Sequence, residues 1–132
     1  MNIFIDTSAF FAVLDKRDRN HPAADRIWQR IITSGDVLFC HNYVLVETSA
    51  LLQHRLGLEA VRTFEEDIVP LLNVLWIAER IHRSAVSALL AASRSSLSLV
   101  DCVSFEVMRA AGIKTAFVFD SDFKEQGFDC LT

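Results

Sequence analysis

The sequence predicts an α/β fold in which a parallel sheet carries helices on both faces. Short apolar runs alternate along the chain with longer amphipathic stretches, which is the order of strand–helix–strand units. Hydrophobic residues make up 52% of the chain and the mean hydropathy is +0.29, more than a sheet with one face in water requires. Strands that follow one another in parallel need crossover connections, and these are right-handed.

The apolar runs predict four short buried strands and a candidate fifth. The four strands are expected at residues 2–5 (NIFI), 36–40 (DVLFC), 73–77 (NVLWI) and 115–119 (TAFVF). The run FDCL near residue 128 is the candidate fifth strand. A chain of 132 residues has room for one domain, spanning 1–132, that buries roughly two thirds of the surface its unfolded form exposes.

The amphipathic stretches predict the helices between these strands, at residues 21–34, 43–56, 58–72, 79–93 and 98–112. Pro22 suits a first helical turn, and Gly57 suits a helix end. Pro70 interrupts the third stretch because proline lacks the N–H that a helix interior uses. Ser98, followed three residues later by Asp101, resembles a capping box at the start of the last helix.

Composition excludes several classes of protein. No apolar run reaches the roughly 18 to 20 residues of a membrane span, and the N-terminus has no secretory signal pattern, so we expect a cytoplasmic protein with no membrane partner. Three cysteines without a C-x-x-C spacing indicate neither a disulfide framework nor a zinc clip. The net charge of −4 disfavours nucleic-acid binding through bulk positive charge, although a cation held in an acidic cleft would still accept phosphate.

Several carboxylates stand at positions that bear on function. Asp6 and Asp120 each follow an apolar strand, and ligands of open parallel sheets bind at the carboxyl ends of strands. Glu47 lies inside a mostly apolar helical stretch, where an unpaired carboxylate would cost several kcal/mol. Taken singly, Asp6 and Asp101 have an ordinary interpretation as helix caps, as do Asp120 and Asp122 as turn residues.

One functional interpretation covers the whole set: strand-end aspartates and helix-borne carboxylates converge in one acidic pocket. Such a pocket repels itself and raises the pKa of its members unless a divalent cation neutralises it. Carboxylate oxygens are hard ligands that favour Mg²⁺ or Mn²⁺. We therefore expect a metal site formed by Asp6, Glu47, Asp101 and Asp120.

The motifs IDTSAF, VLVETSALL and SLVDCVSFEVMRAAGIKTAFVFDSDF, with a closing GF, resemble PIN domains, most closely the VapC-like ribonuclease toxins of toxin–antitoxin pairs. The resemblance implies a three-layer α/β/α sandwich with a central parallel sheet of four or five strands. It also implies Mg²⁺- or Mn²⁺-dependent cleavage of single-stranded or loop RNA, an antitoxin partner and a homodimer.

The resemblance assigns site residues one by one. Asp6, Glu47 and Asp101 match the first three acidic positions of the family, and Asp120 matches the fourth, which Asp122 could share or replace. Thr7 or Ser8 matches a hydroxyl that assists the site, and Ser104 is expected to add a supporting contact.

The expected reaction is phosphodiester hydrolysis, with Asp6, Asp101 and Asp120 as direct ligands. Glu47 would bind a second metal, hold a metal-bound water or take a proton from the nucleophile, and the sequence does not choose among these.

The alternative function is that of a catalytically silent PIN-like module that binds RNA or protein. Acid–base chemistry by His21, His41, His54 and His82 has no paired spacing to support it. The basic residues, including Lys16, Arg17, Arg19, Arg80, Arg83 and Arg94, are interpreted as a solvated face.

Overall fold

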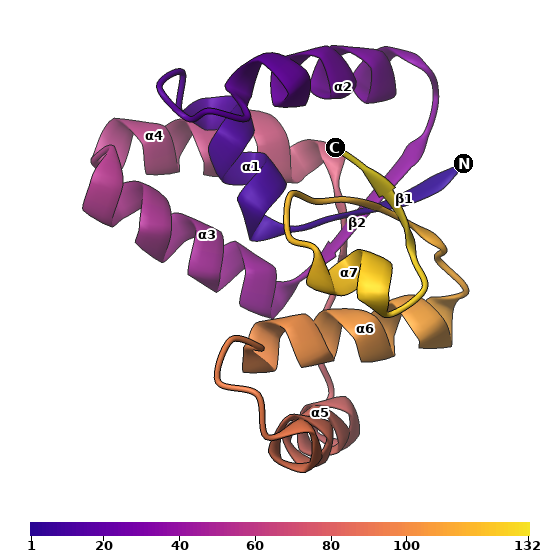
Figure 1. Ribbon diagram of the computed structural model, residues 1–132. Coiled ribbons are helices and arrows are strands. Elements are labelled where there is room, and N and C mark those ends of the chain that lie inside the picture. Colours follow the sequence, from indigo (N-terminus) through magenta and orange to yellow (C-terminus); the bar gives the residue numbers. More distant parts are fainter.

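The computed structural model describes all residues from 1 to 132 and contains a five-stranded parallel sheet (Figure 1). Its order is β3-β2-β1-β4-β5, and every neighbouring pair is parallel. The strands are β1 (Asn2–Ile5), β2 (Val37–His41), β3 (Asn73–Leu75), β4 (Thr115–Phe117) and β5 (Asp129–Leu131). The predicted parallel sheet is confirmed, including its fifth strand, although β3 and β4 are each two residues shorter at the carboxyl end than predicted.

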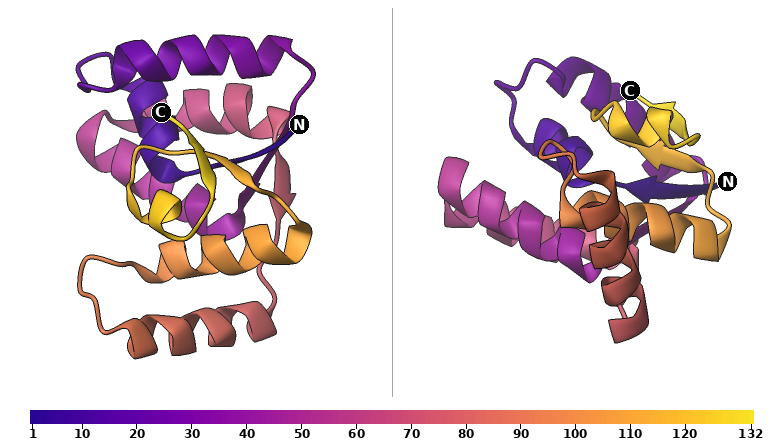
Figure 2. Two further views of the ribbon diagram at one scale, coloured as in Figure 1. Left: turned by 45° about the vertical axis from the view of Figure 1, so that its right-hand side comes forward. Right: turned by 60° about the horizontal axis from the view of Figure 1, so that its bottom comes forward.

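Helices cover both faces of the sheet, which confirms the three-layer α/β/α arrangement (Figures 1 and 2). The helices on one face are α1 (Thr7–Leu14), α2 (His21–Thr33), α3 (Asn42–Arg55) and α4 (Leu58–Thr63). Those on the other are α5 (Glu79–Ala92), α6 (Leu99–Ala111) and the short α7 (Asp122–Glu125). In the sheet, β2 and β3 lie on one side of β1, and β4 and β5 lie on the other. The point where the strand order reverses, the switch point of this fold, is therefore between the central strands β1 and β4.

The central strand explains the high hydrophobic content. Ile3, Phe4 and Ile5 are all 0% exposed, because alternate side chains of β1 enter the two opposite layers of core. On one face the ring of Phe4 stacks on Phe123 of α7, with the centroids 6.3 Å apart. Elsewhere in the core Phe10 of α1 meets Phe64 edge-on at 5.0 Å.

The helix predicted over 58–72 is wrong in its length. Regular α-helix ends at Thr63 and is followed by a π-helical turn, η1 (Phe64–Ile68), and a 3₁₀ turn, η2 (Val69–Leu71). The wider turn buries both Phe64 and Ile68 in the core, and Pro70 occupies the tighter turn that follows. The simple helical period therefore does not continue past Thr63.

Other local expectations agree with the structure. Ser98 and Asp101 form a reciprocal capping box at the start of α6, which ends at Gly112 with φ 69°. Cys40 and Cys102 are buried free thiols, and Cys130 is half-buried and also free. No helix has both the length and the apolar character that crossing a membrane would demand.

Candidate metal centre

Asp6 lies at the point where β1 passes into α1 and is both a helix cap and a member of the acidic cluster. Its Oδ2 accepts the backbone N–H of Ser8 at 3.0 Å and the Ser8 hydroxyl at 2.7 Å. The residue as a whole is only 5% exposed. The capping interpretation is therefore correct for Asp6, and it fixes the carboxyl group at the carboxyl edge of the sheet, with the other oxygen free of protein donors.

Ser8 joins the ends of the two central strands. Its Oγ donates to Asp6 and accepts the backbone N–H of Phe119 at 3.0 Å, in the segment that leaves β4 toward Asp120. Thr7 lies on the other side, where its Oγ1 accepts a hydrogen bond from Thr48 of α3 at 3.0 Å. Ser8 thus hydrogen-bonds to a carboxylate of the cluster, whereas Thr7 ties α1 to the helix that carries Glu47.

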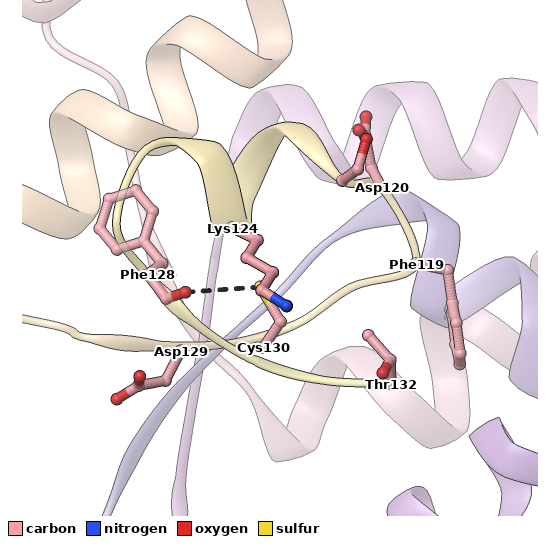
Figure 3. A pocket seen from close by; sticks show the side chains of 8 residues that line it. Phe119, Asp120, Lys124, Phe128, Asp129, Cys130 and Thr132 are labelled. Atoms are coloured by element: carbon pink, nitrogen blue, oxygen red, sulfur yellow. Dashed lines mark hydrogen bonds between the residues drawn. The ribbon is translucent and has the colours of Figure 1, made fainter.

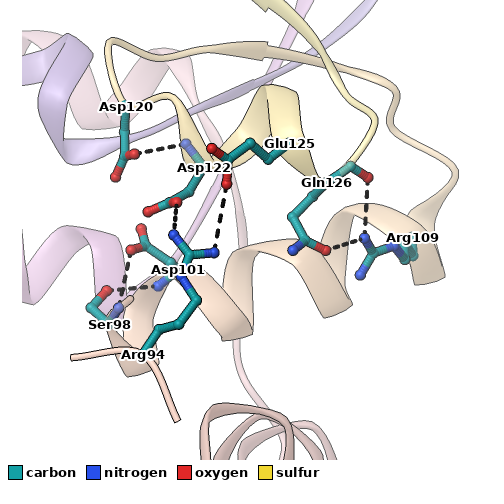
Figure 4. Close-up of polar contacts among 8 residues, drawn as sticks. All are labelled: Arg94, Ser98, Asp101, Arg109, Asp120, Asp122, Glu125 and Gln126. Carbon is teal, nitrogen blue, oxygen red and sulfur yellow. Dashed lines mark hydrogen bonds and ion pairs between the residues drawn. The ribbon is translucent and has the colours of Figure 1, made fainter. Parts of the chain in front are cut away.

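Asp101 is held at the first turn of α6. Its Oδ2 accepts the backbone N–H of Ser98 at 3.2 Å, and its own N–H donates to Ser98 Oγ at 3.0 Å (Figure 4). Glu47, in the middle of α3, is half-buried and makes no hydrogen bond or ion pair with protein groups. Glu47 lines a cavity, so its carboxylate does not bear the cost of full burial that its apolar sequence neighbours suggested.

That cavity brings together the four predicted carboxylates from four separate parts of the chain. It has a volume of about 410 Å³. Its lining consists of Asp6, Thr7, Ser8, Glu47, Leu51, Ser98, Asp101 and Asp120. Leu51 is the single apolar member, and none of the four histidines or of Lys16, Arg17 and Arg19 takes part.

Burial and mutual repulsion disfavour the ionised forms of the carboxylates in the cluster. Burial raises the pKa of Asp6 to about 7, and the charges of Asp101 and Glu47 add to this effect against the hydrogen bonds from Ser8. The pKa of Asp101 is also raised, first by burial and then by Asp120 and Glu47. Burial raises the pKa of Asp120 as well, with Asp122 contributing. A divalent cation would remove this penalty, and an all-oxygen donor set fits Mg²⁺ or Mn²⁺.

Asp120 and Asp122 have different surroundings. One oxygen from each of Asp101, Asp120 and Asp122 lies within 4.8 Å of the others, so all three are candidate ligands on distance alone. However, Asp122 does not line the cavity, and its Oδ1 is paired with Arg94 Nη2 at 2.9 Å (Figure 4). Its backbone N–H donates to Asp120 Oδ1 at 2.9 Å. Asp122 therefore lies outside the cavity and orients Asp120 through its backbone N–H.

Arg94 is a neighbour of the acidic cluster whose contacts the sequence did not reveal. Its guanidinium pairs with Asp122 and lies 3.5 Å from the carboxylate of Glu125, so it is no simple member of a solvated face. It stands in the loop between α5 and α6. Nothing in its local sequence marks it, because its partners come from α7, 28 residues further on in the case of Asp122.

Ser104 does not touch a carboxylate. Its hydroxyl donates to the carbonyl of Val100 at 2.9 Å and lies 2.8 Å from His41 Nε2. His41 Nδ1 accepts the backbone N–H of Val44 at 3.3 Å, so Nε2 carries the proton and donates to Ser104. Burial lowers the pKa of His41 to about 4, which keeps it neutral. This buried series of hydrogen bonds connects the first turn of α6 to β2 and α3. The only sign of it in the sequence was His41, a polar residue directly after a predicted strand.

Comparisons with known proteins identify the family and the fold. The PIN domain family model matches residues 3–129. A curated relative, the 23S rRNA-specific endonuclease VapC20 of Mycobacterium tuberculosis, is 34% identical over 127 residues, covering 96% of this chain and 95% of the relative.

Among solved structures, the crystal structure of M. tuberculosis VapC20, described as a sarcin-ricin loop cleaving toxin, superposes with a TM-score of 0.85 at 32% identity, covering 96% of this chain and 95% of the other. FitAcB from Neisseria gonorrhoeae has a TM-score of 0.70 at 14% identity, with 98% and 96% of the two chains covered, and shows the same fold.

Proposed function

Since the chain belongs to the PIN-domain family, we propose that it is a metal-dependent endoribonuclease that serves as the toxin of a toxin–antitoxin pair. The observation that carries the proposal is the single cavity lined by Asp6, Glu47, Asp101 and Asp120. Its chemistry is that of a cation site, and it lies at the switch point of the sheet, where ligands of such folds bind. The M. tuberculosis relative named as an endonuclease matches along almost the whole chain, which supports the same activity here.

In the proposed mechanism Asp6, Asp101 and Asp120 hold the cation. Asp6 is fixed by Ser8, Asp101 by the capping box with Ser98, and Asp120 by the N–H of Asp122. A bound Mg²⁺ or Mn²⁺ supplies Lewis acidity toward water and toward phosphate oxygens. All three carboxylates are oriented by backbone donors, but Asp6 lies outside the group of carboxylate oxygens within 4.8 Å of one another, which consists of Asp101, Asp120 and Asp122. On this mechanism Asp6 and the other two ligands must draw together when the cation binds.

Glu47 has a different proposed role. It lines the same cavity but has no protein hydrogen-bond partner, so its carboxylate remains free to accept a proton. We assign it to receive the proton of the water that attacks the scissile phosphorus. On this assignment Glu47→Gln lowers kcat strongly and leaves the affinity for Mn²⁺ within a few-fold of wild type, whereas a ligand role would reduce both together.

The proposed substrate is 23S rRNA, since the relative of 34% identity is named as specific for that RNA. The proposed partners are an antitoxin that blocks the cavity and a second copy of this chain. The net charge of −4 makes non-specific RNA binding weak, so recognition depends on the cation and on local contacts beside it.

The test is cleavage of purified ribosomes and of protein-free 23S rRNA with Mg²⁺ or Mn²⁺, with and without chelator, followed by mapping of the cut ends. We expect discrete metal-dependent cuts that Asp101→Asn abolishes. Asp25→Asn, at an exposed position of α2, is the matched control and should cleave like wild type. RNA retention without cleavage under any of these conditions would favour the alternative, a catalytically silent binding module.

A further inference from the structure

Beside Asp120 lies a second hollow, between the segment that leaves β4 and the end of β5 (Figure 3). Its volume is about 380 Å³, within the range of small-ligand pockets. Phe119, Ser121, Lys124 and Thr132 are among the residues that line it. Asp120 belongs to the lining of both this hollow and the acidic cavity, so the two spaces adjoin at that residue.

We propose that this hollow, hereafter the Phe119 subsite, binds one nucleotide of the RNA next to the scissile phosphate. The base would stack on Phe119, and Lys124 would bind the neighbouring phosphate. The inference rests on the proposed function and deepens it, because it states how an acidic protein holds RNA at this cavity. A chain whose phosphate occupies the acidic cavity reaches the subsite directly across Asp120.

Phe119 has the properties of a stacking platform. Its backbone N–H is bound to Ser8 Oγ, which fixes it relative to Asp6, and its ring packs edge-on against Phe117 with the centroids 6.0 Å apart. The ring is only half-buried, so part of it remains open to the hollow. Base stacking on such a ring is sequence-tolerant, and its loss weakens binding by roughly 5- to 100-fold.

Lys124 is a free cation at the same place. It is exposed on α7 and has no carboxylate within ion-pair distance, whereas its neighbours Asp122 and Glu125 both pair with Arg94. Figure 3 shows its ammonium group extending into the hollow. Unpaired Lys124 is therefore available for a phosphate, while Asp129 and Thr132 offer an acceptor and a hydroxyl to the edge of a base.

The test compares Phe119→Leu, Phe119→Trp and Lys124→Gln with wild type, and uses Lys114→Gln as the matched control. Lys114 is likewise exposed but precedes β4, at the amino edge of the sheet. Three quantities are measured: affinity for a labelled single-stranded RNA in Ca²⁺, the KM and kcat for 23S rRNA cleavage in Mn²⁺, and the affinity for Mn²⁺ alone.

We expect Phe119→Leu to weaken RNA affinity and raise KM about 10-fold, with kcat and Mn²⁺ affinity nearly unchanged, and Phe119→Trp to restore wild-type values. Lys124→Gln should weaken RNA binding and reduce its salt slope by about one, whereas Lys114→Gln should not. If wild type cleaves RNA and Phe119→Leu keeps the wild-type KM, the subsite is refuted and the nuclease function stands. If wild type neither binds nor cleaves RNA, both proposals fail.

Discussion

Replacing Asp6 by Asn should stabilise the metal-free protein while it destroys activity. The Asp6 carboxyl group is almost fully buried, and its pKa of about 7 lies well above the ordinary value of 3.8. A raised pKa means that folding is favoured at low pH, and that this contribution is lost as pH rises from about 4 through about 7. Above that range the folded protein carries an ionised carboxylate that the unfolded chain would solvate better.

The magnitude follows from the size of the shift. About three pKa units correspond to an upper value of about 4 kcal/mol of lost stability above pH 7. Asn keeps the shape of the side chain, and its carbonyl oxygen is able to accept both hydrogen bonds from Ser8. After allowance for the weaker acceptor, we expect Asp6→Asn to gain about 1–3 kcal/mol at pH 8, or roughly 3–5 °C in Tm for each kcal/mol.

Urea unfolding in chelator at pH 4 and pH 8 measures this effect, because the acids outside the cluster titrate alike in both proteins and cancel in the difference. The two proteins should be equally stable near pH 4, and the variant should be the more stable one at pH 8. Asp36→Asn is the control of opposite sign: the N-terminal ammonium and Ser34 hold the pKa of Asp36 below its usual value, so its loss should destabilise at pH 8. Equal stability of Asp6→Asn and wild type at pH 8 would refute the reasoning.

Three further predictions concern the surroundings of the site. Ser104→Ala should cost about 1–3 kcal/mol in urea unfolding, because the buried Nε2–H of His41 loses its acceptor. Arg94→Gln should shift the pH–rate profile of cleavage to higher pH, because Asp122 loses its counter-charge and its negative charge then raises the pKa of the neighbouring Asp120 further. Asp122→Asn removes that charge and should shift the profile to lower pH. Ser93→Gly should raise stability by roughly 0.5 kcal/mol in thermal unfolding, because Ser93 holds a left-handed backbone with φ 52° that glycine adopts without strain.

The sheet and most of the acidic cluster were predictable because both depend on short-range patterns. An apolar run that stops at Asp6 or shortly before Asp120 marks the end of a buried strand, and parallel strands bring their carboxyl ends to one edge. Glu47 was identifiable because its neighbours are apolar. In each case a local sequence feature coincides with the position in the fold.

Contacts between distant segments could not be predicted in the same way. The sequence favoured Asp120 but left Asp122 able to share or replace it; the cavity lining and the pairing of Asp122 with Arg94 separate them. The role of His41 depends on Ser104, 63 residues away. The helix after Leu58 changes to a wider turn at Phe64–Ile68, which no local propensity records.

The central claim is that Asp6, Asp101 and Asp120 share one divalent cation. Crystals soaked in Mn²⁺ at pH 8, where Asp6 is mostly ionised, test it through an anomalous difference map. We predict one strong peak inside the cavity, within coordination distance of all three carboxylates, that is absent from crystals of Asp101→Asn. Manganese found only outside this cavity, with the three carboxylates unshifted, would contradict the account.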